Sequence, residues 1–439
     1  MTTPPVWKVA GISLGITVWL LLYVALVLVP GARSMKGFAV YFTAADVAWR
    51  TPDDAKHIYD DEWFRDRMRA AGFKVRDMFR PNPPTLAVLS GPLRAMPATG
   101  GAYVWAALNL LALIAGIGIL RAALRVPCWH GLWMVPLIAS AQPVLHHFAR
   151  GQIYLLLFAV LAAVFWAILR DRPGWAGVGL GLLLAAKISG VWLVVVLLAM
   201  RQWRIVLSAV ATVLIVTASS FLVVGTAMWS AYLDVLSNGP FLPFRSVTAY
   251  QTVASLWGQL FVFDPIWNPH PATNLPAMAN ILTTAVFLLA LIATARVGMP
   301  SSGNLERRAL VVAMSMALIV ANSPVAEDYH YVLVIPSAVA AAWWAMRSRA
   351  SVTAWLLLAL AGCLLTLPIP FKSPLLSEGW LALLAFPRVY GAYLLWLWLL
   401  WQLRPGANEP PSSHRPATNS EPRSRHNVPP LATTTREVS

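Results

Sequence analysis

The sequence predicts an all-α polytopic membrane protein. Hydrophobic residues make up 58% of the 439-residue chain and charged residues only 12%, whereas a soluble domain carries about 25% charged residues. Apolar runs of about 17 to 25 residues, each long enough to cross a hydrocarbon layer of ~30 Å, recur along most of the chain. The net charge of +15 is explained by arginines that flank such spans on the cytoplasmic side. We therefore expect membrane lipids, and no nucleic acid, as partners.

The N-terminal part of the chain combines one span with a large polar segment. Val6–Val29 is too long for a signal-peptide core and lacks a small-residue cleavage site, so it is predicted to be an uncleaved span. Residues 31–84 interleave acidic and basic residues and are predicted to form a first outer loop with short helices at Val40–Ala48 and Asp61–Ala71. Thr85–Met96 is apolar but short and follows two prolines, so it should dip into the membrane without crossing it.

Further apolar segments fill most of the remaining chain. Two polar stretches interrupt or end them: a second outer loop at 225–278, rich in Trp, Pro and Asn, and a Pro/Ser/Thr/Arg-rich tail at 404–439, which we expect to be disordered and cytoplasmic. Residues 1–403 would then form the transmembrane domain. The later predicted spans are Ala102–Leu120, Leu132–Phe148, Ile153–Leu169, Ala176–Met200, Ile205–Val224, Ala277–Ala295, Leu310–Asn322, Tyr331–Met346, Val352–Pro368 and Leu381–Trp401.

Lys187 interrupts the otherwise uncharged segment Ala176–Met200. An ammonium near the bilayer interior is costly unless it has a partner or a wet cavity. Lys187 therefore either snorkels to the interface or awaits an anion. A hairpin of two half-helices that turns near Lys187 would bring the count to about twelve spans. It would also place the arginine clusters on the cytoplasmic side: Arg121/Arg125, Arg170/Arg172, Arg201/Arg204, Arg296/Arg307/Arg308, Arg347/Arg349 and Arg404.

The same threading places another set of polar residues on the outer face. A straight crossing at Lys187 would invert every later loop, so we favour the hairpin. A polar cleft, partly within the membrane, is then expected at the outer surface. Its predicted contributors are the two outer loops, Arg150–Gln152, Lys187, Asp328–His330 and Lys372.

Four segments resemble a known family. PVLHHFARGQIYLLLFAVLAAVFWAILRDRPGWAGVGLGLLLAAKISG is similar to the central signature of the family-87 glycosyltransferases. MFRPNPPTLAVLSGPL, SPVAEDYHYVLVIP and the IYD that ends at Asp60 resemble three further family segments, in the same order. The resemblance covers roughly residues 5 to 400. It implies a GT-C-type fold and a mannosyltransferase that acts on the outer face of the cell membrane.

The resemblance also implies the substrates and the roles of several residues. The donor would be polyprenyl-phosphate-mannose and the acceptor a glycolipid or lipoglycan, with inversion and without metal or cofactor. Because transfer leaves a phosphate anion, fixed positive charge is needed, for which Lys187, Arg150 and Lys372 are candidates. A base must also take the proton of the acceptor hydroxyl. In the family this is an acidic residue at the start of the first outer loop, aided by a histidine, here His330.

The chain departs from the family at that acidic position. The family pattern D-x-x-x-Y is replaced by Gly37 followed four residues later by Tyr41, and glycine cannot act as a base. Asp46 is the predicted substitute, with Asp60 and Asp328 as alternatives. The predicted substrate-binding residues are Gln152, Gln251 and Tyr41.

Two other functions remain open on the sequence alone. The chain could be a carrier or flippase for lipid-linked sugars, although carriers usually have related halves and no internal repeat is visible here. The missing loop aspartate could also mark a catalytically silent relative. Packing or helix capping explains His146 and His147 as well as function does.

Overall fold

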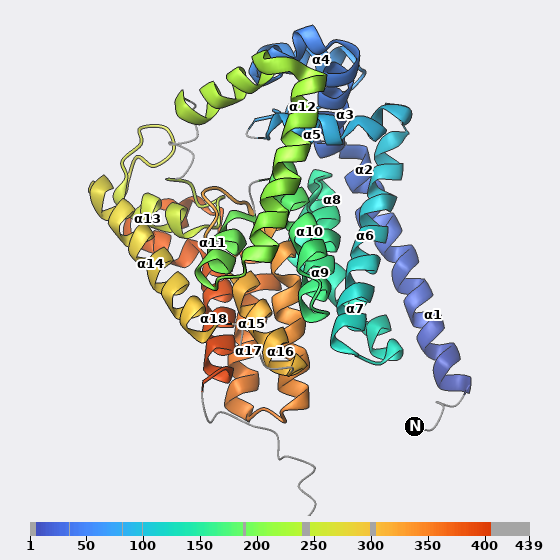
Figure 1. The fold of residues 1–439 in the computed structure, drawn as a ribbon, viewed down its shortest axis with the longest axis vertical. Coiled ribbons are helices and arrows are strands. Elements are labelled where there is room, and N and C mark those ends of the chain that lie inside the picture. Colours follow the sequence, from blue (N-terminus) through green and yellow to red (C-terminus); the bar gives the residue numbers. More distant parts are fainter. Residues whose placement is uncertain are drawn as a thin grey trace, which may run out of the picture.

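The computed structural model is built from helices and describes residues 6–34, 36–80, 82–98, 100–187, 190–238, 246–298 and 304–404. The predicted tail at 404–439 lies outside these residues except for Arg404. Figure 1 shows long helices arranged side by side, with a cap of shorter elements at one end. In the described part of the chain, five helices are long and apolar enough to cross a membrane, or six if the bent pair at 379–402 is one span. The chain is therefore an all-α polytopic membrane protein, whereas the predicted count of about twelve spans is not confirmed.

The cap contains most of the predicted first outer loop. Two of its helices, α3 (Lys36–Arg50) and α4 (Asp61–Ala70), correspond to the two predicted short helices. The predicted membrane dip is the short helix α5 (Pro84–Leu89), followed by a 3-10 helix at Gly91–Ala95. Figure 1 shows α3 and α4 at the end of the molecule opposite the N-terminus. The interior of the cap is aromatic: the rings of Tyr59 and Phe79 lie 5.8 Å apart.

Several predicted spans differ from the observed helices. Leu132–Phe148 is divided into α7 (Cys128–Ala139) and α8 (Gln142–Arg150), because the chain turns at Ser140 and restarts its helix before Pro143. The span predicted at Ile205–Val224 belongs to α12 (Trp203–Asn238), which bends at Gly225 and continues into the cap. The start of the predicted second outer loop is therefore helical. Two helices were not predicted: α13 (Val253–Phe261) lies in the predicted second outer loop, and α2 (Val29–Ser34) extends from the first span into the predicted first outer loop. The remaining elements correspond to predicted spans, with ends shifted by as much as one to two helical turns: α1 (Val6–Tyr23), α6 (Gly101–Leu124), α9 (Tyr154–Leu169), α14 (Pro276–Val297), α15 (Leu305–Ala317), α16 (Ile335–Arg347), α17 (Val352–Thr366) and α18 (Pro387–Gln402).

The segment around Lys187 is broken into two helices, as predicted. Helix α10 (Pro173–Ala186) ends at Lys187, and α11 (Val191–Ala199) follows. Ser208, near the start of α12, donates a hydrogen bond to the carbonyl of Gly174, near the start of α10, at 2.9 Å. After α11 the chain has thus returned to the level at which α10 began. The two helices form a hairpin, and Lys187 lies at its turn.

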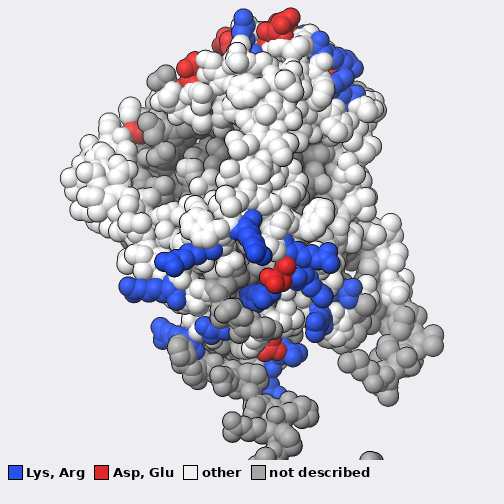
Figure 2. Space-filling model, in the orientation of Figure 1, with Lys and Arg blue, Asp and Glu red and all other residues white. Residues whose placement is uncertain are grey.

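Charged residues are absent from a broad middle zone of the surface seen in Figure 2. Below this zone Figure 2 shows a band of Lys and Arg, and above it a mixture of acidic and basic residues on the cap. Two exposed tryptophans, Trp175 and Trp203, lie at the starts of α10 (Pro173–Ala186) and α12, close in sequence to Arg172 and Arg201. Arginines and tryptophans at one level are typical of a membrane–water interface.

Candidate functional site

The candidate site is centred on Lys187, at the turn between α10 and α11. The residue leaves the helix with an extended backbone (φ −154°, ψ 140°), and its backbone N–H still donates to the carbonyl of Leu183. Its ammonium nitrogen lies 5.3 Å from the ring centre of Tyr154 and 5.9 Å from that of Tyr41. Aromatic faces attract a cation at these distances. The structure thus holds this ammonium on two aromatic rings, beneath the polar cap.

Tyr41 connects the cap to the membrane helices at this point. Its hydroxyl donates to Gln152 Oε1 at 2.6 Å, and its side chain is buried. Gln152 follows the Gly151 turn that separates α8 from α9. The structure therefore brings together Lys187 and two of the predicted substrate-binding residues, Tyr41 and Gln152.

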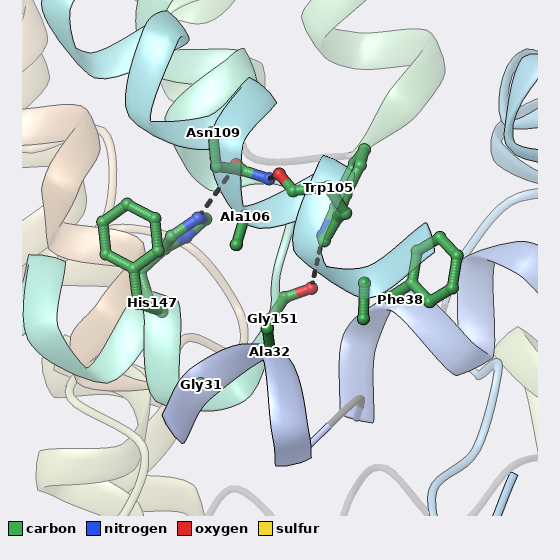
Figure 3. A pocket seen from close by; sticks show the side chains of 10 residues that line it. Gly31, Ala32, Phe38, Trp105, Ala106, Asn109, His147 and Gly151 are labelled. Carbon is green, nitrogen blue, oxygen red and sulfur yellow. Dashed lines mark hydrogen bonds between the residues drawn. The ribbon is translucent and has the colours of Figure 1, made fainter. Parts of the chain in front are cut away.

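Behind this contact lies a small apolar pocket lined by residues of α2, α3, α6 and α8 (Figure 3). Trp105 donates its indole N–H to the carbonyl of Gly151 at 2.8 Å, which fixes the α8–α9 turn. Asn109 donates to the carbonyl of Trp105, so its side-chain oxygen accepts from His147 Nε2 at 3.0 Å. His147 is fully buried in this network. We assign it a packing role, in agreement with one of its two predicted alternatives.

Glu327 joins two of the predicted phosphate-binding residues. Its carboxylate lies 3.9 Å from the Arg150 guanidinium and 3.6 Å from the Lys372 ammonium. Arg150 ends α8 and Lys372 lies between α17 and α18, so the contact links distant parts of the chain. Each cation is less than half exposed, with 43% and 42% of the side chain accessible. Both cations thus lie next to the same carboxylate, that of Glu327.

His330 belongs to the same cluster. Its ring centre lies 4.1 Å from that of Tyr154, and its Nδ1 accepts the backbone N–H of Glu327 at 3.1 Å. In the neutral ring the proton must then be on Nε2. His330 is therefore arranged to donate a hydrogen bond from Nε2 rather than to accept a proton at Nδ1.

One charged residue of the cluster, Asp77, was missed by the sequence analysis. Its carboxylate interacts electrostatically with Lys187, Arg150 and Lys36. Burial raises the pKa of Asp77 above its ordinary value, although these three cations and a hydrogen bond from the Met78 N–H oppose the shift. The available signal was its place directly before MFRPNPP, the segment that resembles the family. Single acidic residues among basic ones are common in polar loops, however, so this signal was weak.

The other predicted acidic residues lie elsewhere, in pairs or caps. Asp46 pairs with Arg50 one helical turn further along α3, at 3.1 Å. Asp60 caps α4 and accepts the N–H groups of Glu62 and Trp63. The carboxylate of Asp46 is thus engaged by a cation, and that of Asp60 by backbone N–H groups.

Asp328 and Gln251 are buried beside the cluster. Asp328 is 1% exposed and contacts His146 Nδ1 at 2.5 Å. Gln251 is fully buried; its amide donates to the carbonyls of Thr248 and Ala385 and its oxygen accepts from the Arg388 N–H. The structure therefore gives Gln251 a connecting role and leaves its amide no free donor for an acceptor substrate.

Gly37 makes a backbone contact that excludes any side chain. A Cβ atom at this position would lie 2.2 Å from the carbonyl oxygen of Gly151. Gly31, in α2, meets the carbonyl oxygen of Phe148 in the same way, at 2.5 Å. The cap and the end of α8 thus approach at the distance that glycine allows. A side chain at position 37 would point into this contact and not toward Lys187.

Among the residues that the structure describes, no group of three or more His, Cys, Asp or Glu side chains is placed to hold a metal ion. The side chains of the site offer cations for an anion, a histidine N–H donor, and the carboxylates of Glu327 and Asp77.

Sequence comparisons show which known proteins the chain is similar to. A polyprenol-phosphate-mannose-dependent alpha-(1-2)-phosphatidylinositol mannoside mannosyltransferase of Mycobacterium tuberculosis is 24% identical over 302 residues. The match covers 64% of this chain and 66% of that protein, so the chain spans just under two thirds of the relative's length. No solved structure matches the chain. The sequence model of glycosyltransferase family 87 matches residues 81–324, which include Arg150, Gln152 and Lys187. This match extends over more than half of the sequence, and the chain belongs to glycosyltransferase family 87.

Proposed function

We propose that the chain transfers a mannosyl residue from polyprenyl-phosphate-mannose to a glycolipid or lipoglycan on the outer face of the membrane. The relative of known activity depends on a polyprenol-phosphate-mannose donor and acts on a phosphatidylinositol mannoside. The reaction is taken to be inverting and to need no metal. In this proposal residues 1–403 act as one transmembrane domain with its site beneath the cap.

The observation that carries the proposal is the convergence of Lys187 and Arg150 on one partly buried place. Transfer breaks the bond between the anomeric carbon and the phosphate, so negative charge grows on the phosphate oxygens. Fixed cations in a site of low dielectric stabilise such charge more strongly than they would in water. Lys187 and Arg150 both interact electrostatically with the carboxylate of Asp77. This supports the view that both cations could act on one bound phosphate. Lys372, through Glu327, is a third contributor at the edge.

The donor must also be oriented. The Nε2–H of His330 is free to donate to a phosphate or sugar oxygen, because its Nδ1 is occupied. Tyr41 and Gln152 form a hydrogen-bonded pair next to the Lys187 ammonium. These groups are polar, yet they lie next to long apolar helices that face lipid. A donor with a polar sugar-phosphate head and an apolar polyprenyl tail matches this combination of a polar site and an apolar surface.

The activity is tested by incubating membranes that contain the chain with radiolabelled polyprenyl-phosphate-mannose and an extracted lipid pool. Label in a glycolipid, above that of membranes without the chain, is the expected result. Other polyprenyl-phosphate sugars serve as competing donors. Transfer of a different sugar alone would replace mannose in the proposal, and the absence of transfer from every donor would overturn it.

The proposed orientation makes a separate prediction by cysteine labelling. In a background with Cys128 and Cys363 replaced by serine, Ile266→Cys should react with an impermeant reagent added outside intact cells, because Ile266 is 78% exposed and lies between α13 and α14. Arg170→Cys, at the exposed end of α9, should react only after the membrane is opened. The reverse pattern would place Lys187 near the cytoplasmic face and contradict the outward site.

A further inference from the structure

An inverting transfer needs a carboxylate or another base with a free lone pair beside the acceptor hydroxyl. Position 37 cannot supply one. The carboxylates of the cap and of the adjoining η6 segment (Asp328–Val334) can therefore be compared by what each already binds.

Most of these carboxylates are engaged. Asp53, Asp54 and Glu62 have no ion pair in the described part of the chain, but the carboxylate that interacts electrostatically with Lys187 is Asp77. Asp61 pairs with Arg65 and Arg80, and Asp66 pairs with Arg69. Glu327 lies between two cations, and Asp328 contacts a histidine. Asp46 and Asp60 have the pair and the cap described above. A carboxylate held by a cation or by backbone N–H groups is a weak base, because these partners stabilise its charged form.

Asp77 differs from the engaged carboxylates in its contacts, and from the others in its interaction with Lys187. Its Oδ1 accepts the backbone N–H of Met78 at 2.8 Å, and no ion pair to Asp77 is found among the described residues. It is partly buried and lies within the electrostatic reach of Lys187 and Arg150, the residues proposed to hold the donor phosphate. Asp77 also interacts electrostatically with the hydroxyl groups of Tyr41 and Tyr329.

We propose that Asp77 is the catalytic base of the transfer. Its free Oδ2 takes the proton of the acceptor hydroxyl as that oxygen forms a bond to the anomeric carbon of the donor sugar. The bond from the same carbon to the phosphate oxygen breaks, and its electron pair leaves with the polyprenyl phosphate. Charge balances, since one carboxylate is neutralised while one phosphate gains the negative charge. This inference rests on the proposed function.

The burial of Asp77 fits such a role. A raised pKa makes the carboxylate a stronger base than a solvated aspartate. It also means that ionised Asp77 does not stabilise the fold: an acid whose pKa is higher in the folded than in the unfolded state contributes stability at low pH, and this is lost as the pH rises through the folded pKa. Removing the charge at neutral pH should therefore leave the fold intact.

The test is Asp77→Asn, with Asp66→Asn as a matched control from the exposed side of α4. We expect Asp77→Asn to lower kcat by about 100- to 10,000-fold. Donor affinity, measured by the change of tryptophan fluorescence on adding polyprenyl-phosphate-mannose, should change less than about threefold, and thermal stability should not fall. Asp77→Glu should keep part of the activity and shift the acidic limb of the pH–rate profile. Asp66→Asn should resemble the wild type throughout.

Each other outcome has a separate meaning. Transfer by Asp77→Asn at a rate close to the wild type would overturn the assignment of the base while leaving the proposed function in place. Loss of donor affinity or of thermal stability together with activity would show that Asp77 holds the cations in position, and would also overturn it. An inactive wild type would overturn the proposed function itself.

Discussion

Lys187→Ala is expected to lower transfer by about 100- to 1,000-fold, the usual effect of removing one group that stabilises charge in a transition state. The ammonium lies at the break between α10 and α11, and no other residue of the hairpin carries charge. In the described part of the chain it contacts two aromatic rings and interacts electrostatically with Asp77, without an ion pair. Alanine removes the charge without removing a strong structural partner, so the variant should still fold.

The measurement is the rate of mannosyl transfer together with the affinity for the donor. Both should fall in Lys187→Ala, whereas Asp77→Asn should lose turnover alone. Lys187→Arg should recover little, because a planar guanidinium on a stem of different length replaces a compact charge between two rings. Lys74→Ala is the control for loss of a cap lysine, since Lys74 is exposed and should be dispensable. Near-normal turnover and donor affinity in Lys187→Ala would contradict the central place of this residue.

The position of Lys187 could be predicted because it depends on local sequence. A lone ammonium in a long apolar run has few physical solutions, and a broken helix near the interface is one of them. The distribution of arginines then predicts the direction of the chain across the membrane. The resulting hairpin is found in the structure, and a series of contacts through Tyr154 and Glu327 links six of the predicted site residues: Lys187, Tyr41, Gln152, Arg150, Lys372 and His330.

The carboxylates were harder to predict because their partners are set by the fold. Asp46 resembles a site residue in sequence, being close to Tyr41, but it lies five residues further along α3 and there meets Arg50. Asp77 carries no local motif. Its environment is created by Lys36, Arg150 and Lys187, which come from three separate segments. Helix breaks were missed for a similar reason: hydropathy finds the apolar stretch but does not show that α7 ends at Ser140.

Gly37→Asp is expected to destroy activity, although it would restore the residue that the family pattern contains. The helix α3 places the Cβ of residue 37 against the Gly151 carbonyl, at 2.2 Å. An aspartate there must displace the cap from α8 or bury a carboxylate beside a carbonyl oxygen, which repels it. Overpacking alone costs about 1–3 kcal/mol, and the buried charge adds to this. The expected result is a low yield of folded protein and no transfer.

A comparison of alanine variants separates the contact from the charge. Gly37→Ala should lower the thermal midpoint in detergent, because its methyl group meets backbone that cannot move aside cheaply. Gly118→Ala, in α6, has nothing within 4 Å of its new Cβ and should be neutral or slightly stabilising, since alanine favours helix over glycine by about 1 kcal/mol. Increased transfer by Gly37→Asp would mean that residue 37 faces the substrate after all. With the contact observed here, position 37 has no room for a side chain, and the proposed base has to come from another part of the cap.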